Sequence, residues 1–187
     1  IVYNGEVYNH LSLRKQLEAK TKINWKGTSD TETLLEMFEN YEVSEVLNSL
    51  HGMFSFALLD KREKEIIFAR DQAGEKPLYL SSSSGYFSFA SDLDPLKNLP
   101  GFNNSLDMEA VEDFLKLNYI PNPKTIYKNS FKIPASSFIK INLNKFIIKS
   151  YNSFEDFIDS DGVEFDTWWS LNDNKFENNS NVHVFEF

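Results

Sequence analysis

Residues 52–71, "GMFSFALLDKREKEIIFARD", contain two apolar runs on either side of a short charged segment. The runs at 52–60 and 65–71 are almost continuously apolar, which is typical of strands covered on both faces. The charged residues 61–64 predict a turn between them. This stretch therefore predicts an antiparallel β-hairpin that is covered on both faces.

Further strands are expected on the C-terminal side of this hairpin. Residues 77–81, "PLYLS", and 86–91, "YFSFAS", are joined across a polar turn at 83–85 and predict a second hairpin. Residues 137–143, "SFIKINL", alternate strictly, and 145–151, "KFIIKSY", are their expected hairpin partner. From residue 152 to residue 187 the sequence is rich in Asn, Asp and Ser without a period, which predicts a weakly ordered linker or tail.

Helices are expected in the remaining segments. Asn9 is a candidate N-cap of a first helix, and Ser29 with Glu32 fits a capping box at the start of a second. A short helix is expected near 46–50, and Asp107 precedes an amphipathic helix that ends before Pro121. Helices and antiparallel strands in this order predict an α+β fold.

Composition excludes several classes of function. The net charge of −9 is spread along the chain and argues against a nucleic acid or an anionic membrane as partner. No apolar run is long enough to span a bilayer. With no Cys and three dispersed His, no disulfide and no metal site are expected. The seven Gly form no phosphate-binding run.

The segment 4–9, "NGEVYN", has two interpretations. Asn4-Gly5 between apolar residues is a strong signal for a tight hairpin turn. However, a helix is expected directly after residue 9, which leaves only a three-residue partner strand. The alternative is a strand whose end presents Asn4 and Gly5 to a ligand.

Five stretches carry a resemblance to a known family: 4–9 "NGEVYN", 27–32 "GTSDTE", 50–60 "LHGMFSFALLD", 69–80 "ARDQAGEKPLYL" and 87–96 "FSFASDLDPL". In this order they resemble the glutamine amidotransferase domain of glutamine-hydrolysing asparagine synthetases, from Ile1 to about Tyr151. Two positions depart from the family pattern, Asp94 where Lys is usual and Ser136 where Gly is frequent.

The resemblance implies a fold and a domain organisation. The fold is the four-layer αββα sandwich of N-terminal nucleophile hydrolases, here incomplete at the N-terminus. Residues 1–151 would form a partial amidotransferase domain, and 152–187 would lead toward a synthetase domain. The family nucleophile is an N-terminal Cys, whereas this sequence begins with Ile1. We therefore expect a piece of a longer protein.

The resemblance also implies site residues. Asn4 and Gly5 would form the oxyanion hole for the glutamine amide, and Glu6 and Asp30 would bind the glutamine α-ammonium group. Asp30 has a second interpretation as a helix N-cap.

The three Arg of the sequence do not match the family's substrate clamp. We interpret Arg70-Asp71 as a structural ion pair at a strand end.

The implied parent makes asparagine from aspartate, ATP and glutamine in the cytoplasm. Its partners would be glutamine and its own C-terminal synthetase domain, with a homodimer as one assembly. ATP and Mg would belong to the synthetase domain, and this chain itself would hold no cofactor. The apolar segments around 52–59 and 86–90 would either form core or line a path for ammonia.

A different class of function remains open: an amidotransferase-like domain without a nucleophile that serves as a binding or regulatory module, or as part of another amide-forming synthetase. The retention of Asn4, Gly5, Glu6 and Asp30 favours the enzyme.

Without a Cys nucleophile, this chain by itself is expected to be inactive. Purified chain incubated with glutamine should release no glutamate above the rate in buffer, measured by an enzyme-coupled glutamate assay. Catalysed release that persists through rigorous purification would contradict the prediction.

Overall fold

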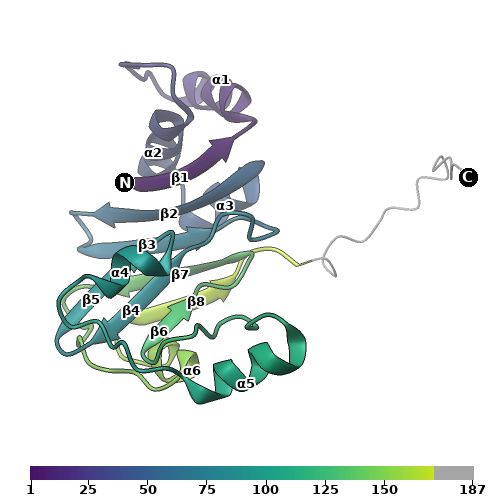
Figure 1. Cartoon of the computed structure of the whole chain (residues 1–187). Helices are drawn as coiled ribbons and strands as arrows, with labels where there is room; N and C mark the ends of the chain where they lie inside the picture. The colour runs from purple at the N-terminus through teal and green to yellow at the C-terminus, as the bar shows by residue number, and fades with distance from the viewer. Residues whose placement is uncertain (171–187) are drawn as a thin grey trace, which may run out of the picture.

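The structure is a computed structural model that describes residues 1–170, and these residues form two antiparallel sheets with flanking helices (Figure 1). The first sheet has the order β1-β2-β3-β7-β8, and its strands are β1 (Val2–Val7), β2 (Gly52–Asp60), β3 (Glu65–Arg70), β7 (Ser137–Asn142) and β8 (Val163–Thr167). The second has the order β5-β4-β6, with β4 (Tyr79–Ser83), β5 (Tyr86–Ala90) and β6 (Ser130–Lys132). The helices are α1 (His10–Lys20), α2 (Asp30–Asn40), α3 (Val43–Ser49), α4 (Leu93–Lys97), α5 (Met108–Leu117) and α6 (Phe154–Ile158).

The predicted hairpin of residues 52–71 is confirmed, and it lies inside the first sheet. β2 and β3 pair from Ser55↔Arg70 to Asp60↔Glu65. Their side chains alternate between two cores, as the pleat of a strand requires. Phe54 and Phe56 enter the core beneath α1–α3, whereas Phe68 enters the core between the sheets. Apolar burial on both faces explains the continuous apolar runs. The predicted second hairpin is also confirmed as β4 and β5.

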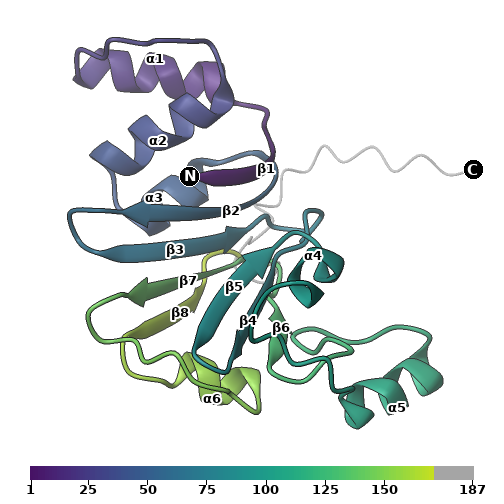
Figure 2. The ribbon, with the colours of Figure 1, turned by 60° about the vertical axis from the view of Figure 1, so that its left-hand side comes forward.

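The elements stack in layers. Helices α1, α2 and α3 cover one face of the first sheet, and the second sheet lies on its other side (Figure 2). Helix α4 packs beside β5, and its Leu96 is fully buried. The order of helices, sheet, sheet and helix confirms the α+β class and agrees with the αββα sandwich.

Two predictions for the C-terminal part are wrong. Residues 145–151 are not the strand partner of β7; that place is taken by β8, which pairs with β7 from Ser137↔Thr167 to Ile141↔Val163. The segment 152–170 is not a weakly ordered linker, because it contains α6 and β8. Trp168 is buried, its Nε1 donates to the Arg70 carbonyl at 3.2 Å, and its ring stacks on Phe54. The remaining part of the predicted tail, 171–187, lies outside the described residues.

Arg70 and Asp71 have the predicted structural role, but not as an ion pair. Within residues 1–170, no salt bridge joins their side chains. The Arg70 guanidinium donates to three backbone carbonyls, those of Gly74, Lys76 and Ile133. The Asp71 carboxylate accepts four backbone N–H bonds, from Phe54, Ala73, Glu75 and Lys76. Both residues are buried, so these bonds fix the 71–77 loop against β2.

Asp71→Ala should lower the free energy of unfolding by more than about 3 kcal/mol, because it leaves several buried backbone donors without acceptors. Asp60→Ala is the matched control. Asp60 accepts two backbone N–H bonds at the exposed β2–β3 turn, so its loss should cost only about 1 kcal/mol. Urea unfolding of this chain measures both values, and equal losses would contradict the prediction.

Candidate glutamine site at the edge of β1

Strand β1 runs straight through Asn4 and Gly5, so the hairpin-turn interpretation is wrong. β1 pairs with β2 from Val2↔Ala57 to Val7↔Gly52, with Gly5 opposite Phe54. Gly5 has φ +150°, and a Cβ at this position would lie 2.1 Å from the Met53 carbonyl oxygen. Glycine is thus required because the two backbones approach too closely for a side chain.

The direction in which the Gly5 N–H points follows from the hydrogen bonds of Phe54, the residue opposite it on β2. The N–H and C=O of Phe54 are both bonded to Asp71, on the β3 side of β2. Gly5 and Phe54 are therefore a pair without mutual hydrogen bonds, and the backbone groups of Gly5 point to the open edge of the sheet. Val7, two residues on, points the same way, and its N–H donates to Asp30. Among the described residues, the N–H of Gly5 has no such acceptor.

Asn4 and Glu6 project from the face of β1 opposite to Tyr3 and Val7, and both are exposed. Asn4 lines a cavity of about 340 Å³ between the two sheets. The other lining residues are Val2 and Tyr3 of β1, Ser55, Phe56 and Ala57 of β2, and Leu78, Phe89, Ala90 and Ser91 near the second sheet. Both apolar segments that were candidates for an ammonia path contribute to this cavity.

Asp30 lies against the same edge of β1. Its Oδ2 accepts the Val7 N–H at 2.9 Å and the Tyr3 hydroxyl at 3.0 Å. Both donors belong to β1, and Gly5 lies between them in the sequence. The structure therefore brings Asp30 next to the strand that carries Asn4, Gly5 and Glu6. The interpretation of Asp30 as N-cap is wrong, because Ser29 caps α2 by accepting the Glu32 N–H.

The Asp30 carboxyl is held in its ionised form. Partial burial by itself would raise its pKa, but hydrogen bonds from Val7 and Tyr3 outweigh burial and lower the pKa below its ordinary value. Burial and the bond to Asp30 raise the pKa of Tyr3, so that its hydroxyl remains a donor. The edge of β1 therefore carries a negative charge at neutral pH.

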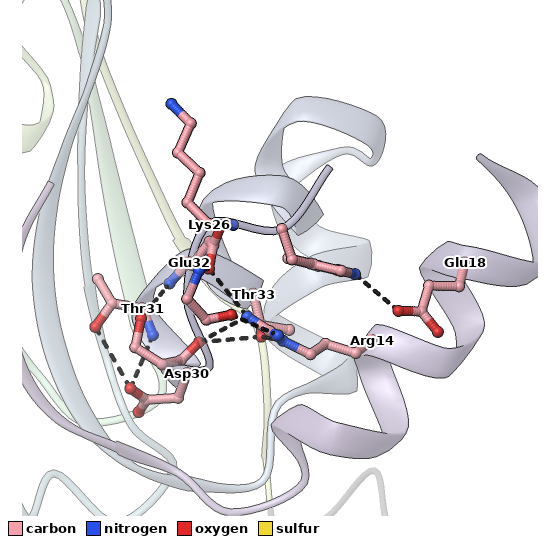
Figure 3. Close-up of polar contacts among 10 residues, drawn as sticks. Arg14, Glu18, Lys26, Asp30, Thr31, Glu32 and Thr33 are labelled. Atoms are coloured by element: carbon pink, nitrogen blue, oxygen red, sulfur yellow. Dashed lines mark hydrogen bonds and ion pairs between the residues drawn. The ribbon is translucent and has the colours of Figure 1, made fainter. Parts of the chain in front are cut away.

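Arg14 of α1 positions the segment that carries Asp30 (Figure 3). Its guanidinium donates to the Gly27 carbonyl at 2.9 Å, to Thr33 Oγ1 at 2.9 Å and to the Glu32 carboxylate at 3.1 Å. The same group lies 4.0 Å from the centre of the Trp25 ring. Glu32 in turn accepts the N–H groups of residues 26 and 27. This network holds the start of α2 against α1.

Sequence reasoning missed the roles of Tyr3 and Arg14. Their contacts to residues 27–33 join separate elements, and no local pattern announces them. Asn9 occupies the N-cap position of α1, as predicted, but its side chain makes no capping hydrogen bond. It bonds to Ser49 and His51 instead.

A scan against known families matches residues 1–152 to the glutamine amidotransferase domain. The chain belongs to this family. The match covers β1, the start of α2 and the cavity between the sheets.

Curated relatives agree with this membership. Asparagine synthetase [glutamine-hydrolyzing] 1 of Bacillus subtilis is 36% identical over 141 residues, which are 74% of this chain and 22% of that protein. A Methanocaldococcus jannaschii protein, named provisionally as a glutamine-hydrolysing asparagine synthetase, is 34% identical over 157 residues, covering 83% of this chain and 30% of the relative. The chain thus spans less than a third of the length of these relatives.

Solved structures show the same fold. Glutamine phosphoribosylpyrophosphate amidotransferase from Bacillus subtilis superposes with a TM-score of 0.58 at 17% identity, over 89% of this chain and 28% of that one. An allosteric regulatory enzyme of purine biosynthesis gives a TM-score of 0.59 at 18% identity, with the same coverage. At this identity the likeness concerns the fold alone, and it confirms the expected αββα sandwich.

In the part of the chain that the structure describes, no group of three or more His, Cys, Asp or Glu is arranged to hold a metal ion. None of the helices within residues 1–170 combines the length and apolar character needed to cross a membrane.

Tyr3→Phe should raise the pKa of Asp30 toward its ordinary value, since it removes one donor to the carboxylate. NMR titration of the carboxyl carbon measures this pKa. Because the pKa of Asp30 is lower in the folded than in the unfolded chain, its bonds stabilise the fold above about pH 4 and are lost as the pH falls further.

Tyr8→Phe is the control for this titration. Tyr8 is exposed, and it is not among the groups that shift the pKa of Asp30. An equal shift of the Asp30 pKa in both variants would contradict the assigned role of the Tyr3 hydroxyl.

Proposed function

We propose that this domain, completed in its parent protein by a nucleophile that residues 1–187 do not contain, hydrolyses the side-chain amide of glutamine and supplies the ammonia to an asparagine synthetase of which it is a part. Asn4 and Gly5 would stabilise the oxyanion, and Glu6 and Asp30 would bind the glutamine α-ammonium group. The observation that carries the proposal is the outward N–H of Gly5, which has no acceptor within residues 1–170 and lies on the strand edge that Asp30 also contacts.

Amide hydrolysis passes through a tetrahedral intermediate with a negatively charged oxygen. Fixed donors aimed at this oxygen lower the barrier, because they need no reorganisation when the charge develops. The Gly5 N–H belongs to a rigid paired strand, and the absence of a Cβ lets a substrate approach the backbone. The neighbouring Asn4 carboxamide is exposed toward the cavity and supplies a second donor.

Free glutamine differs from a glutaminyl residue of a protein by its α-ammonium group. An ionised carboxylate is the group that selects for it. Asp30 is kept ionised by its hydrogen bonds, and its Oδ1 accepts only from Thr31 within the described residues. The Thr31 N–H lies 2.8 Å from this oxygen and the Thr31 hydroxyl 3.4 Å, so an ammonium donor would replace the longer of these two contacts. Glu6 of β1 adds a second carboxylate, and this one is exposed.

The rest of the reaction belongs to the parent protein. ATP, Mg and aspartate would be bound by a synthetase domain, as the names of the relatives suggest. The cavity between the sheets supports a dry exit for ammonia, since most of its lining side chains are apolar. A cytoplasmic location is part of the proposal, as expected for amino-acid synthesis. The alternative of a regulatory module is less well supported, because it gives no reason for an ionised Asp30 beside an open N–H.

In the full-length parent, Asn4→Ala should lower kcat for glutamine hydrolysis about 10²- to 10³-fold with little change in KM. The oxyanion exists only in the transition state, so its donor contributes there and not to substrate binding. Asparagine synthesis from free ammonia should continue, because that route bypasses this site.

Asp30→Asn in the same protein is the contrasting variant. It weakens a contact to bound glutamine, so KM for glutamine should rise more than kcat falls. Glutamate release and ammonia-dependent synthesis, assayed separately, give both comparisons. If Asn4→Ala impaired the two routes equally, Asn4 would be a structural residue and the proposed oxyanion hole would be wrong.

A further inference from the structure

Helix α5 exposes its apolar face. The exposed fractions are 66% for Met108, 50% for Phe114 and 76% for Leu115. Ala110 is the one residue of the helix that is buried. Met108, Val111 and Leu115 follow at spacings of three and four, so they lie on one face of the helix. Leu106 and Tyr119, just beyond the helix ends, are exposed as well. We call Leu106, Met108, Val111, Phe114, Leu115 and Tyr119 the α5 apolar face.

Helix α5 is attached to the domain by its buried Ala110 and by ion pairs of two acidic side chains with the following loop. Lys124 of the following loop pairs with Asp113 at 2.9 Å and with Glu109 at 3.4 Å. At the N-terminus of the helix, the Asp107 N–H donates to the Ile126 carbonyl. Figure 2 shows α5 beyond the edge of the second sheet. Most apolar side chains of α5 are therefore exposed, whereas an ordinary surface helix buries its apolar side.

A contiguous exposed apolar surface of this kind marks an interaction site. Two occupants have to be compared, a second copy of the chain and another part of the same polypeptide. The helix of ten residues is about 15 Å long, so its face is small beside the roughly 800 Å² per partner of a stable complex between free proteins. A covalently linked domain needs less contact area, because the linker keeps it at millimolar effective concentration.

The relatives are long enough to contain such a domain beside the matched segment. The matched segment accounts for 22% to 30% of their chains, so more than two thirds of each relative lies outside it. We propose that the α5 apolar face is the docking surface for the synthetase portion of the same polypeptide. The proposal rests on the proposed function only in assuming that this domain is linked to such a portion.

The methionines allow a direct test by oxidation with hydrogen peroxide, followed by mass spectrometry. Met108 is exposed, whereas Met37 is buried in the core and serves as the internal reference. In this chain alone Met108 should oxidise rapidly, and in the full-length parent it should oxidise at least about tenfold more slowly, because oxidation follows exposure. Equal rates in the two proteins would overturn the proposal. Protection that disappears on dilution would also overturn it, because the occupant would then be a second copy.

Leu115→Asp in the full-length parent places a charge on the docking face at a position where it cannot disturb the core. It should restore rapid oxidation of Met108, lower glutamine-dependent asparagine formation and leave glutamate release unchanged. Lys116→Ala, on the polar side of α5, is the matched control and should keep Met108 protected. If Leu115→Asp also keeps Met108 protected, the proposal fails. Absence of glutaminase activity together with a protected Met108 would reject the proposed function and retain the docking surface.

Discussion

The close approach of β1 to β2 at Gly5 and Gly52 is the constraint on which the site depends. A Cβ on either glycine would lie 2.1 Å from a carbonyl oxygen of the opposite strand. With both side chains absent, β1 pairs along its whole length, and the alternation of an antiparallel ladder turns the N–H groups of Gly5 and Val7 outward. A side chain at Gly5 would displace β1 and, with it, the donor that the proposed chemistry requires.

β1 is an edge strand of the first sheet, and at Val7 its outward N–H bonds to a side chain instead of to another strand. Asp30 accepts the Val7 N–H as a neighbouring strand would, and it adds a negative charge that a strand lacks. The bonds that make the edge stable are also those that lower the pKa of Asp30. The structural role and the proposed binding role therefore coincide in one carboxylate, which depends for its position on Arg14 and the capped start of α2.

The C-terminal segment shows how composition can hide structure. Residues 163–167, "VEFDT", alternate like an edge strand, and Ser153 with Asp156 has the spacing of a helix cap. The surrounding Asn, Asp and Ser outweighed these short signals, although β8 completes the first sheet and Trp168 packs on Phe54. Ser136 is a similar case. It has φ +57°, which explains the frequent Gly in the family, and its hydroxyl donates to the Gln72 carbonyl at 2.7 Å.

The sequence by itself determined the hairpin of residues 52–71, the second hairpin, the capped α2, the family and the four candidate site residues, because periodicity, caps and motifs are local. The tertiary structure decided that Asn4-Gly5 lies within a strand, that β8 and not 145–151 pairs with β7, and that Tyr3 and Arg14 support Asp30. It also decided that the apolar side of α5 faces outward, since a pattern identifies an apolar face but not what covers it. Each of these features depends on contacts between residues that are distant in the chain. Burial and shared hydrogen bonds set the energies of such contacts, and the neighbouring sequence does not.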